Sequence, residues 1–366
     1  MIKVLVIDDS ALMRKLLGRV LGDVTDFDVH FARNGVEGLE QLAAVNPDVV
    51  TLDIHMPGMD GLACLDRIMI ENPRPVLMVS SLTHEGADVT LEALRLGAVD
   101  FVPKPDGALS LHMEVFGPLF VAKVRAAAGA KLRASLRLRE RVQHRIGGSA
   151  PPRRRVGGSG EAPVRASGDG IVVVGTSTGG PPALEALLCA LPSTFPWPIV
   201  IAQHMPANFT GALARRLDGL CAICVSEVAR PTALEPGHAY IGRGDADVII
   251  SKIAGDLVVA PAPADAGRPW HPNADRLVES AIAHIPPSAL VGVLMTGMGD
   301  DGAGSMTKLR ALGGRTIAEA EETAVVWGMP GKLVEAGGAT WVLPLPNIAE
   351  QLRKLVSLHA PNPQRI

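Results

Sequence analysis

The chain has 366 residues, with 35 lysines and arginines against 38 aspartates and glutamates, which gives a formal net charge of −3. This length exceeds the roughly 100–200 residues of an ordinary domain, so we expect two domains. Hydrophobic residues make up 47% and charged residues 20%, close to globular averages, which excludes a chain disordered throughout. The aromatic fraction of 3% is low for a surface that stacks single-stranded nucleic acid.

The small net charge is an average over unlike segments. Residues 123–165 contain 12 basic and 2 acidic residues, a local charge of +10, so the rest of the chain carries −13. A DNA-binding regulator is one interpretation of this basic segment. However, basic runs are more often solvated tethers, and no helix-turn-helix pattern follows the first domain. We therefore expect no nucleic-acid partner.

Targeting signals are not evident in the sequence. The apolar stretch at the N-terminus is too short for a signal peptide. No run approaches the roughly 20 apolar residues of a membrane span. We therefore expect a soluble, cytoplasmic protein without membrane insertion.

Residues 1–125 alternate short apolar runs with stretches whose apolar residues repeat at helical spacing. Runs that are apolar on both faces and joined by helices indicate a parallel sheet covered on both sides. Five such runs are present, at Val4–Ile7, Val29–Ala32, Val49–Leu52, Val76–Val79 and Val99–Val102. This pattern predicts a flavodoxin-like (βα)5 domain.

Polar residues follow the ends of these predicted strands. Asp8 and Asp9 follow the first, Asp53 closes the third, Ser80 follows the fourth and Lys104 follows the fifth. Because ligands of an open parallel sheet bind at the carboxyl ends of its strands, we expect these side chains to share one pocket. Three converging carboxylates repel one another. A hard cation with oxygen ligands, such as Mg²⁺, relieves that repulsion and can hold a phosphate as well.

The first domain resembles the receiver domain of two-component response regulators. The matching motifs are Val-Ile-Asp-Asp-Ser, Leu-Asp-Ile-His-Met-Pro-Gly-Met-Asp-Gly, Met-Val-Ser-Ser and Val-Pro-Lys-Pro. The resemblance implies that Asp53 is the phosphoacceptor and that Asp8 and Asp9 position Mg²⁺ beside it. A carboxylate can take a phosphoryl group when a metal and a lysine neutralise its oxygens.

Three further residues match receiver positions. The resemblance implies that Lys104 contacts the phosphoryl group, that Ser80 is the hydroxyl of the switch and that Phe101 is its aromatic residue. It also implies a chemotaxis histidine kinase as the phosphodonor.

Residues 126–168 interrupt the alternation of strands and helices. Within them, Gly147–Gly160 is rich in glycine and contains three consecutive arginines, a composition typical of linkers. We predict a basic, Gly/Pro-rich linker at 126–168, a second domain at 169–358 and a tail at 359–366.

The second domain repeats the strand and helix pattern, which predicts a doubly wound α/β domain with a parallel sheet. The strands are expected at Ile171–Val174, Ile199–Ala202, Val248–Ile250 and Val291–Met295. The helices are expected at Pro181–Ala190, Gly211–Leu217, Ala274–Ala283 and Ala303–Leu312.

The segment from Gly175 to Gly180 joins the first of these strands to a helix that opens with Pro181 and Pro182. A phosphate-binding loop is one interpretation, but it requires G-x-G-x-x-G or a Walker lysine, and neither is present. The other interpretation is a nucleophile elbow, because Ser177 lies in a G-x-S-x-G pattern.

A nucleophilic serine needs a base and an acid that orients the base. His204 follows the strand Ile199–Ala202, and Asp300 and Asp301 follow the strand Val291–Met295. All three groups are therefore expected at the carboxyl edge of one parallel sheet. Their order differs from the Ser…Asp…His order of α/β-hydrolases, which disfavours that superfamily.

The second domain resembles the chemotaxis protein-glutamate methylesterase family. The shared motifs are Gly-Thr-Ser-Thr-Gly-Gly, Gln-His-Met-Pro, Phe-Thr, Pro-Gly-His-Ala-Tyr-Ile, Thr-Gly-Met-Gly-x-Asp-Gly-Ala and Val-Val-Trp-Gly-Met-Pro. The resemblance implies Ser177 as nucleophile, His204 as base and Asp301 as orienting acid. Backbone N–H groups near Thr178 and Met298 are candidates for holding the oxyanion.

The same resemblance implies the substrates, which are γ-glutamyl methyl esters of methyl-accepting chemoreceptors, with deamidation of receptor glutamines as a related reaction. It implies no cofactor in the esterase site. Two departures from the family pattern, at Gly242–Asp247 and at Asn273, are expected near the rim of the site and affect receptor preference more than chemistry.

The combination of a receiver and an esterase predicts an enzyme controlled by phosphorylation. We hypothesise that the unphosphorylated receiver covers the catalytic cleft and that phosphorylation of Asp53 opens it. An output domain that binds a partner without catalysis is the alternative. The set Ser177, His204 and Asp301 argues against it, because a binding module does not need all three.

Cys221 and Cys224 form an isolated CxxC in a segment that reads as a strand. A thioredoxin-type pair lies at a helix N-terminus, and a structural zinc site needs two further ligands. We therefore predict ordinary small apolar residues at both positions.

Overall fold

The computed structural model describes residues 1–105, 109–132 and 170–357, and the chain divides into two compact units, Met1–Pro151 and Pro152–Ile366. Most of the predicted linker and all of the predicted tail lie outside the described residues. The helix that ends the first unit continues to Ala128, into the segment predicted as linker. None of the described helices is both long and apolar enough to cross a membrane.

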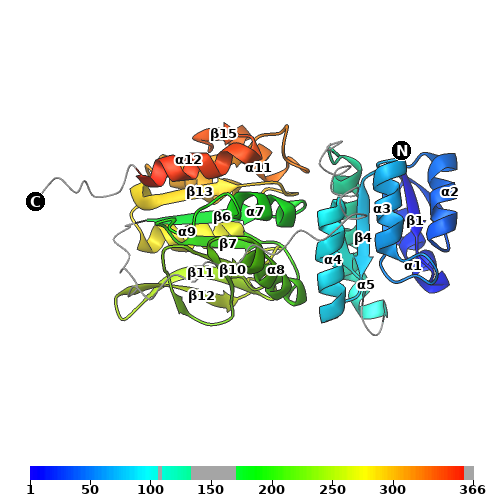
Figure 1. Cartoon of the computed structure of the whole chain (residues 1–366), viewed down its shortest axis with the longest axis horizontal. Coiled ribbons are helices and arrows are strands. Elements are labelled where there is room, and N and C mark those ends of the chain that lie inside the picture. The colour runs from blue at the N-terminus through cyan, green and yellow to red at the C-terminus, as the bar shows by residue number, and fades with distance from the viewer. Residues whose placement is uncertain (106–108, 133–169, 358–366) are drawn as a thin grey trace, which may run out of the picture. The chain divides into compact units, whose positions relative to one another are not determined.

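The first unit, drawn in blue and cyan in Figure 1, is a sheet flanked by helices. The sheet has five parallel strands in the order β2-β1-β3-β4-β5. This is the flavodoxin-like order, so the predicted (βα)5 fold is confirmed. The strands are β1 Ile2–Ile7, β2 Phe27–Ala32, β3 Val49–Asp53, β4 Val76–Ser80 and β5 Asp100–Pro103. The helices are α1 Ala11–Gly22, α2 Gly35–Val45, α3 Gly61–Glu71, α4 His84–Leu96 and α5 Leu109–Ala128.

The helices of this unit begin where a polar side chain accepts a hydrogen bond from their first turn. Ser10, Asn34, Asp60 and Thr83 cap α1 to α4 in this way, each bonding the backbone N–H three residues on. Each cap ends a loop on the carboxyl side of the sheet. Gly61 lies at the start of α3, where a Cβ would approach the Asp53 carbonyl oxygen to 2.2 Å. A glycine there lets the helix pack directly against the end of β3.

The second unit contains a seven-stranded parallel sheet in the order β15-β14-β13-β6-β7-β10-β8, which confirms the predicted doubly wound parallel sheet. Its strands are β6 Ile171–Thr176, β7 Ile199–Gln203, β8 Cys224–Val228, β10 His238–Gly242, β13 Leu290–Leu294, β14 Arg315–Glu319 and β15 Trp341–Leu343. The helices are α7 Gly180–Leu188, α8 Ala207–Leu220, α9 Ala274–His284, α10 Ala303–Ala311, α11 Met329–Glu335 and α12 Leu345–Ser357, with a 3-10 turn at Pro287–Ala289.

A smaller antiparallel sheet of β9 Thr232–Ala233, β11 Ala246–Ile253 and β12 Asp256–Pro263 lies beside the large one, below it in Figure 1. Val248–Ile250 belongs to β11 here, so the prediction of a parallel strand at this position was wrong. The strands β11 and β12 are joined by Ala254 and Gly255, both at positive φ, which is the geometry of a two-residue hairpin turn. The hairpin packs on α9, and their apolar side chains continue the core beneath the large sheet.

The CxxC segment also differs from the sequence interpretation. Cys221 caps the end of α8 and strand β8 begins only at Cys224. The Sγ atom of Cys221 lies 3.0 Å from Sγ of Cys189, at the end of α7, and both thiols are free. The contact of Cys221 with Cys189 therefore joins two helix ends.

Candidate functional sites

The acidic residues of the first unit meet at the carboxyl edge of its sheet. Asp8 follows β1, Asp53 ends β3, and both carboxylates are buried, whereas Asp9 is exposed. Carboxylate oxygens of these three residues lie within 4.8 Å of one another. Lys104 follows β5, and its Nζ lies 2.7 Å from Asp53 Oδ2 and 3.4 Å from Asp8 Oδ2. The structure therefore brings four of the five predicted pocket residues together.

This pocket has more negative charge than its own residues neutralise. Asp8 Oδ2 and Asp53 Oδ2 are buried, and among the described residues no hydrogen bond of good geometry reaches either oxygen. Both form ion pairs with the ammonium of Lys104. Burial raises the pKa of Asp8, and the Asp53 charge raises it further, against the opposing effect of Lys104. Three carboxylates at this spacing, with one lysine facing two of them, fit a divalent cation with oxygen ligands.

The two predicted switch residues lie beside this pocket. Ser80 ends β4 with its side chain buried, and its Oγ lies 2.7 Å from Thr90 Oγ1 on α4. Its carbonyl oxygen accepts a hydrogen bond from the Lys104 backbone N–H. Phe101 is buried in β5, with Lys123 Nζ 5.5 Å from its ring centroid. Ser80 thus connects α4 to the backbone that carries the pocket lysine.

In the second unit, Ser177 lies in the sharp turn between β6 and α7 and is 4% exposed. Its N–H donates to Thr296 O at 3.0 Å, and its carbonyl oxygen accepts from the Gly180 N–H at 2.8 Å. Gly179 has a φ of +77°, and a Cβ there would lie 2.7 Å from Val325 Cβ. The glycine that the motif requires is therefore needed both for the turn and for packing.

His204 and Asp301 come from the two strands that flank β6. His204 follows β7, and its N–H donates to Thr176 O at 3.1 Å, which fixes it next to the serine turn. Its Nε2 lies 2.7 Å from Asp301 Oδ2, while its Nδ1 is buried without a hydrogen-bond partner among the described residues. A carboxylate on Nε2 favours the tautomer that carries the proton there, which leaves the Nδ1 lone pair to accept a proton. Asp300 is exposed, unlike this pair.

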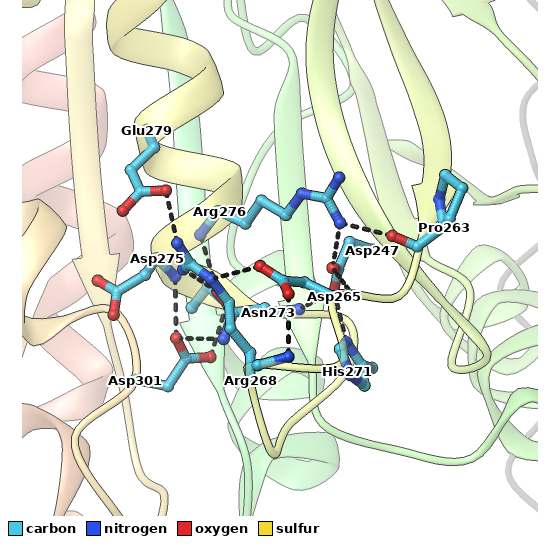
Figure 2. A network of polar contacts seen from close by, with 12 residues as sticks. Asp247, Pro263, Asp265, Arg268, His271, Asn273, Asp275, Arg276, Glu279 and Asp301 are labelled. Atoms are coloured by element: carbon cyan, nitrogen blue, oxygen red, sulfur yellow. Dashed lines mark hydrogen bonds and ion pairs between the residues drawn. The ribbon is translucent and has the colours of Figure 1, made fainter.

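Asp301 is a buried carboxylate that the chain itself neutralises. It accepts hydrogen bonds from the Ala274 N–H at 2.7 Å and the Asp275 N–H at 3.0 Å, the first turn of α9, and from Asn273 Nδ2 at 2.8 Å (Figure 2). Burial alone would raise the pKa of Asp301, but the bond to His204 and these backbone donors hold it below its ordinary value. The positive end of a helix also favours an anion there.

The candidate oxyanion donors lie on two turns that touch each other. Thr178 follows the serine, and its carbonyl oxygen accepts from Thr296 Oγ1 at 2.8 Å. The backbone before Met298 passes so close that a Cβ on Gly297 would lie 2.8 Å from Ser177 Cβ. Buried Glu319 accepts the Thr296 N–H at 2.8 Å and so fixes this contact between the turns.

Two residues near the histidine were not identified as site residues from the sequence. Trp270 stacks on His204, with ring centroids 5.6 Å apart and an interplanar angle of 12°. Asn273, which the sequence placed at the rim, is 3% exposed and bonded to Asp301, so the rim assignment was wrong. Asp247, in the second departing segment, is fully buried as well. An asparagine directly before an apolar helical repeat is a helix-cap signal, and that signal could have located Asn273.

Comparison with known families gives two matches. A family model described as CheB methylesterase matches residues 172–352, and a model described as response regulator receiver domain matches residues 4–115.

Curated relatives match nearly the whole chain. A protein-glutamate methylesterase/protein-glutamine glutaminase 2 of Rhodopseudomonas palustris (strain BisB18) is 56% identical over 353 residues, covering 95% of this chain and 96% of the relative. A protein-glutamate methylesterase/protein-glutamine glutaminase 3 of Rhodospirillum rubrum is 51% identical over 358 residues, covering 98% and 97%. Among solved structures, the Thermotoga maritima CheB methylesterase catalytic domain is 39% identical, with a TM-score of 0.49, and covers 51% of this chain and 98% of that one.

We expect Asp8→Asn to stabilise the first unit at neutral pH without divalent cations. The folded-state pKa of Asp8 is raised, chiefly by burial, so its ionised form destabilises the fold above that pKa, and the amide removes this cost. The amide oxygen can still accept the Ser10 N–H. Hydrogen exchange of peptides from residues 1–105 in the full chain, in EDTA and in Mg²⁺, measures the effect.

The exposed Asp9→Asn is the matched control for this measurement. It should leave protection in EDTA nearly unchanged, because its carboxylate is not buried. Mg²⁺ should increase protection in the wild-type chain and much less in either variant. An Asp8→Asn chain less protected than wild type in EDTA would contradict the prediction.

The lowered pKa of Asp301 predicts acid sensitivity of the second unit. An acid with a depressed folded-state pKa stabilises the fold above its unfolded value, and this contribution is lost as pH falls through the folded value, below about pH 4. Asp301→Asn should cost roughly 1–3 kcal/mol at neutral pH and flatten the loss below pH 4. Fluorescence-detected urea unfolding reports this unit selectively, because all four tryptophans lie in residues 170–357. Equal acid slopes for the two chains would contradict the assignment.

Proposed function

The chain belongs to the CheB methylesterase family and joins that hydrolase to a response regulator receiver domain, and on this premise we propose that it serves chemotactic adaptation under control of phosphorylation. It is a protein-glutamate methylesterase/protein-glutamine glutaminase. The proposed substrates are γ-glutamyl methyl esters on chemoreceptors, with receptor glutamines as a second class. The proposed phosphodonor is a chemotaxis histidine kinase, and the cytoplasmic location remains a prediction.

The buried pair of His204 and Asp301 carries the proposal for the esterase site. A histidine with one nitrogen on a carboxylate and the other without a partner among the described residues is the arrangement that a serine nucleophile needs. Ser177 follows β6, the strand that pairs with the strand before His204. Its backbone is fixed by hydrogen bonds to Thr296 and Gly180. A module that only binds a partner has no use for an ionised carboxylate buried behind a histidine.

We assign the steps accordingly. The Ser177 hydroxyl attacks the ester carbonyl carbon while His204 Nδ1 takes its proton, and Asp301 stabilises the imidazolium that forms. N–H groups of Thr178 and Met298 are the proposed donors to the oxyanion, and one such donor typically lowers the barrier by about 3 kcal/mol. Collapse of the intermediate breaks the ester C–O bond, and methanol leaves with the proton from His204. Water, deprotonated by His204, then cleaves the acyl-serine.

For glutamine substrates the same residues have the same roles. Collapse of the intermediate breaks the amide C–N bond instead, and ammonia leaves with the proton that His204 returns. Each cycle ends with glutamate on the substrate and with Ser177 and His204 restored.

In the receiver, the proposed phosphoacceptor is the buried Asp53 carboxylate. The neighbouring Lys104 supports this role. Its Nζ lies 2.7 Å from Asp53 Oδ2, so the ammonium can neutralise oxygens of an incoming phosphoryl group. Asp8, Asp9 and Asp53 would hold Mg²⁺, which supplies charge neutralisation at the phosphoryl oxygens when bound. We propose Ser80 and Phe101 as the residues that respond to the acyl phosphate.

Ser177→Ala should abolish methanol release from methylated chemoreceptors, with a fall in kcat of at least about 10³-fold, because alanine has no hydroxyl with which to form the acyl-enzyme. Binding of receptor should persist, and the unfolding midpoint should stay close to wild type, since the substitution removes one oxygen from a folded turn. Methanol is measured by coupled oxidation, and ammonia release from receptor glutamines is followed in the same samples. A variant that retains wild-type methanol release would overturn the nucleophile assignment.

A small-molecule phosphodonor with Mg²⁺ should raise the esterase rate of the full chain several-fold. Asp53→Asn should show its basal rate and no response, because the amide cannot form the acyl phosphate. Asp48→Asn, at the start of β3 and away from the pocket, is the control that should respond as wild type. Equal rates with and without phosphodonor in the wild-type chain, despite acid-labile phosphate incorporation, would contradict phosphorylation control.

A further inference from the structure

Behind the catalytic pair lies a second cluster of charged groups, centred on Asp247 near the start of β11. Asp247 is fully buried, and four N–H groups converge on its carboxylate (Figure 2). Oδ1 accepts from the Asn273 N–H at 2.8 Å and from His271 Nδ1 at 2.8 Å, and Oδ2 accepts from Arg276 at 2.6 Å and from the Asp265 N–H at 3.2 Å. No step of the proposed reaction uses this carboxylate.

The donors to Asp247 all come from one stretch of chain, residues 265–276, which leads into α9. Burial alone would raise the pKa of Asp247, but His271, Arg276 and the Asn273 N–H hold it below its ordinary value, so the group is ionised at neutral pH. A buried charge with this many donors is costly to move, because every displaced donor leaves an unpaired group. The carboxylate therefore fixes residues 265–276 to the hairpin.

Asn273 connects this anchor to the catalytic carboxylate. Its backbone N–H donates to Asp247, while its side-chain Oδ1 accepts from Arg268 at 2.7 Å and from the Arg276 N–H at 2.9 Å. Two donors on Oδ1 fix the orientation of the amide, so Nδ2 must face Asp301, where it donates at 2.8 Å. One side chain thus caps α9 and restrains the acid of the triad.

The same stretch contacts the histidine from its other side. Trp270, three residues before Asn273, stacks on the His204 ring at 5.6 Å between centroids. His204 is therefore restrained through its Nε2 by Asp301 and through its ring face by Trp270. Both restraints depend on the backbone that Asp247 holds.

We propose that Asn273 and Asp247 are positioning residues for the esterase reaction: Asn273 orients Asp301, and Asp247 fixes Asn273 and the loop that carries Trp270. This inference rests on the proposed roles of His204 and Asp301. A purely structural role, in which Asn273 serves only as the cap of α9, predicts a loss of stability without a specific change in catalysis.

The variant Asn273→Ala distinguishes a positioning role from a purely structural one when kcat and KM are measured as a function of pH. The alanine leaves Asp301 with one donor fewer, so its charge is less neutralised and favours the protonated form of the neighbouring imidazole. The acid limb of kcat/KM for methanol release should therefore move to higher pH, by several tenths of a unit or more. We expect kcat to fall roughly tenfold and KM to change less than twofold.

Two further variants serve as controls in this experiment. Ser280→Ala removes the hydroxyl that accepts the Ile250 N–H, so it loosens the packing of the same helix on the same hairpin without touching the network. It should lower the unfolding midpoint and leave kcat and the pH profile unchanged. Asn273→Ser keeps a cap and a hydroxyl donor, and should restore most of the rate and the wild-type acid limb.

Asp247→Asn tests the anchor through a double-variant cycle. The amide preserves the shape but presents a donor to groups that are themselves donors, so kcat should fall. If Asp247 acts through Asn273, kcat of the double variant with Asn273→Ala should lie within about twofold of kcat of the slower single variant. Multiplied rate losses would overturn the anchor role.

The outcomes distinguish this inference from the proposed function. An unchanged pH profile and kcat in folded Asn273→Ala would overturn the positioning role, while Ser177→Ala would still lack activity. If Ser177→Ala retained activity, the triad assignment itself would fail, whatever the Asn273 variants showed. If Asn273→Ala lost rate only in proportion to its loss of folded protein, as measured by tryptophan fluorescence, a cap alone would explain the residue.

Discussion

Both sites depend on the same physical constraint: a carboxylate buried at the edge of a parallel sheet has to be neutralised by hydrogen-bond donors or by a cation. The two units meet this constraint in opposite ways. Asp301 receives two backbone N–H groups, an amide and a histidine, and these partners lower its pKa in spite of burial. Asp8 shares one lysine with Asp53, and burial raises its pKa. The esterase acid is satisfied by the chain, whereas the receiver pocket is left short of positive charge.

This difference fits the chemistry proposed for each site. A serine esterase has to hold its histidine in one tautomer and orientation through every step, so a preorganised acid is an advantage. A phosphorylation site has to bind a cation and a phosphoryl group, and carboxylates in excess of the single lysine favour binding of a cation. The Lys104 ammonium lies 2.7 Å from Asp53 and 3.4 Å from Asp8. It can therefore neutralise charge in the pocket both before and after phosphorylation.

Most of the architecture was predictable from the sequence, because long apolar runs and helical repeats report buried strands and their covering helices. Both parallel sheets, and the strands that carry Ser177, His204 and Asp301, follow from that pattern. The hairpin at residues 246–263 did not follow, because its strands are partly polar and pair antiparallel, and its turn is identified by the positive φ of Ala254 and Gly255, which only the structure shows. Strands β10 and β14 were not predicted either, since polar residues interrupt their apolar runs.

The supports of the candidate site were harder to predict than its central residues, for a physical reason. Ser177, His204 and Asp301 each follow an apolar strand, so a local pattern indicates where they lie. Asn273 and Asp247 are 26 residues apart, and their contact depends on a hairpin folding back onto the start of a helix. The sequence marks Asn273 only as a cap, and the same cap holds the carboxylate of the proposed triad. Helix stability and the geometry of catalysis are therefore coupled at one side chain, so a substitution that keeps the cap but loses the donor should impair the reaction without unfolding the helix.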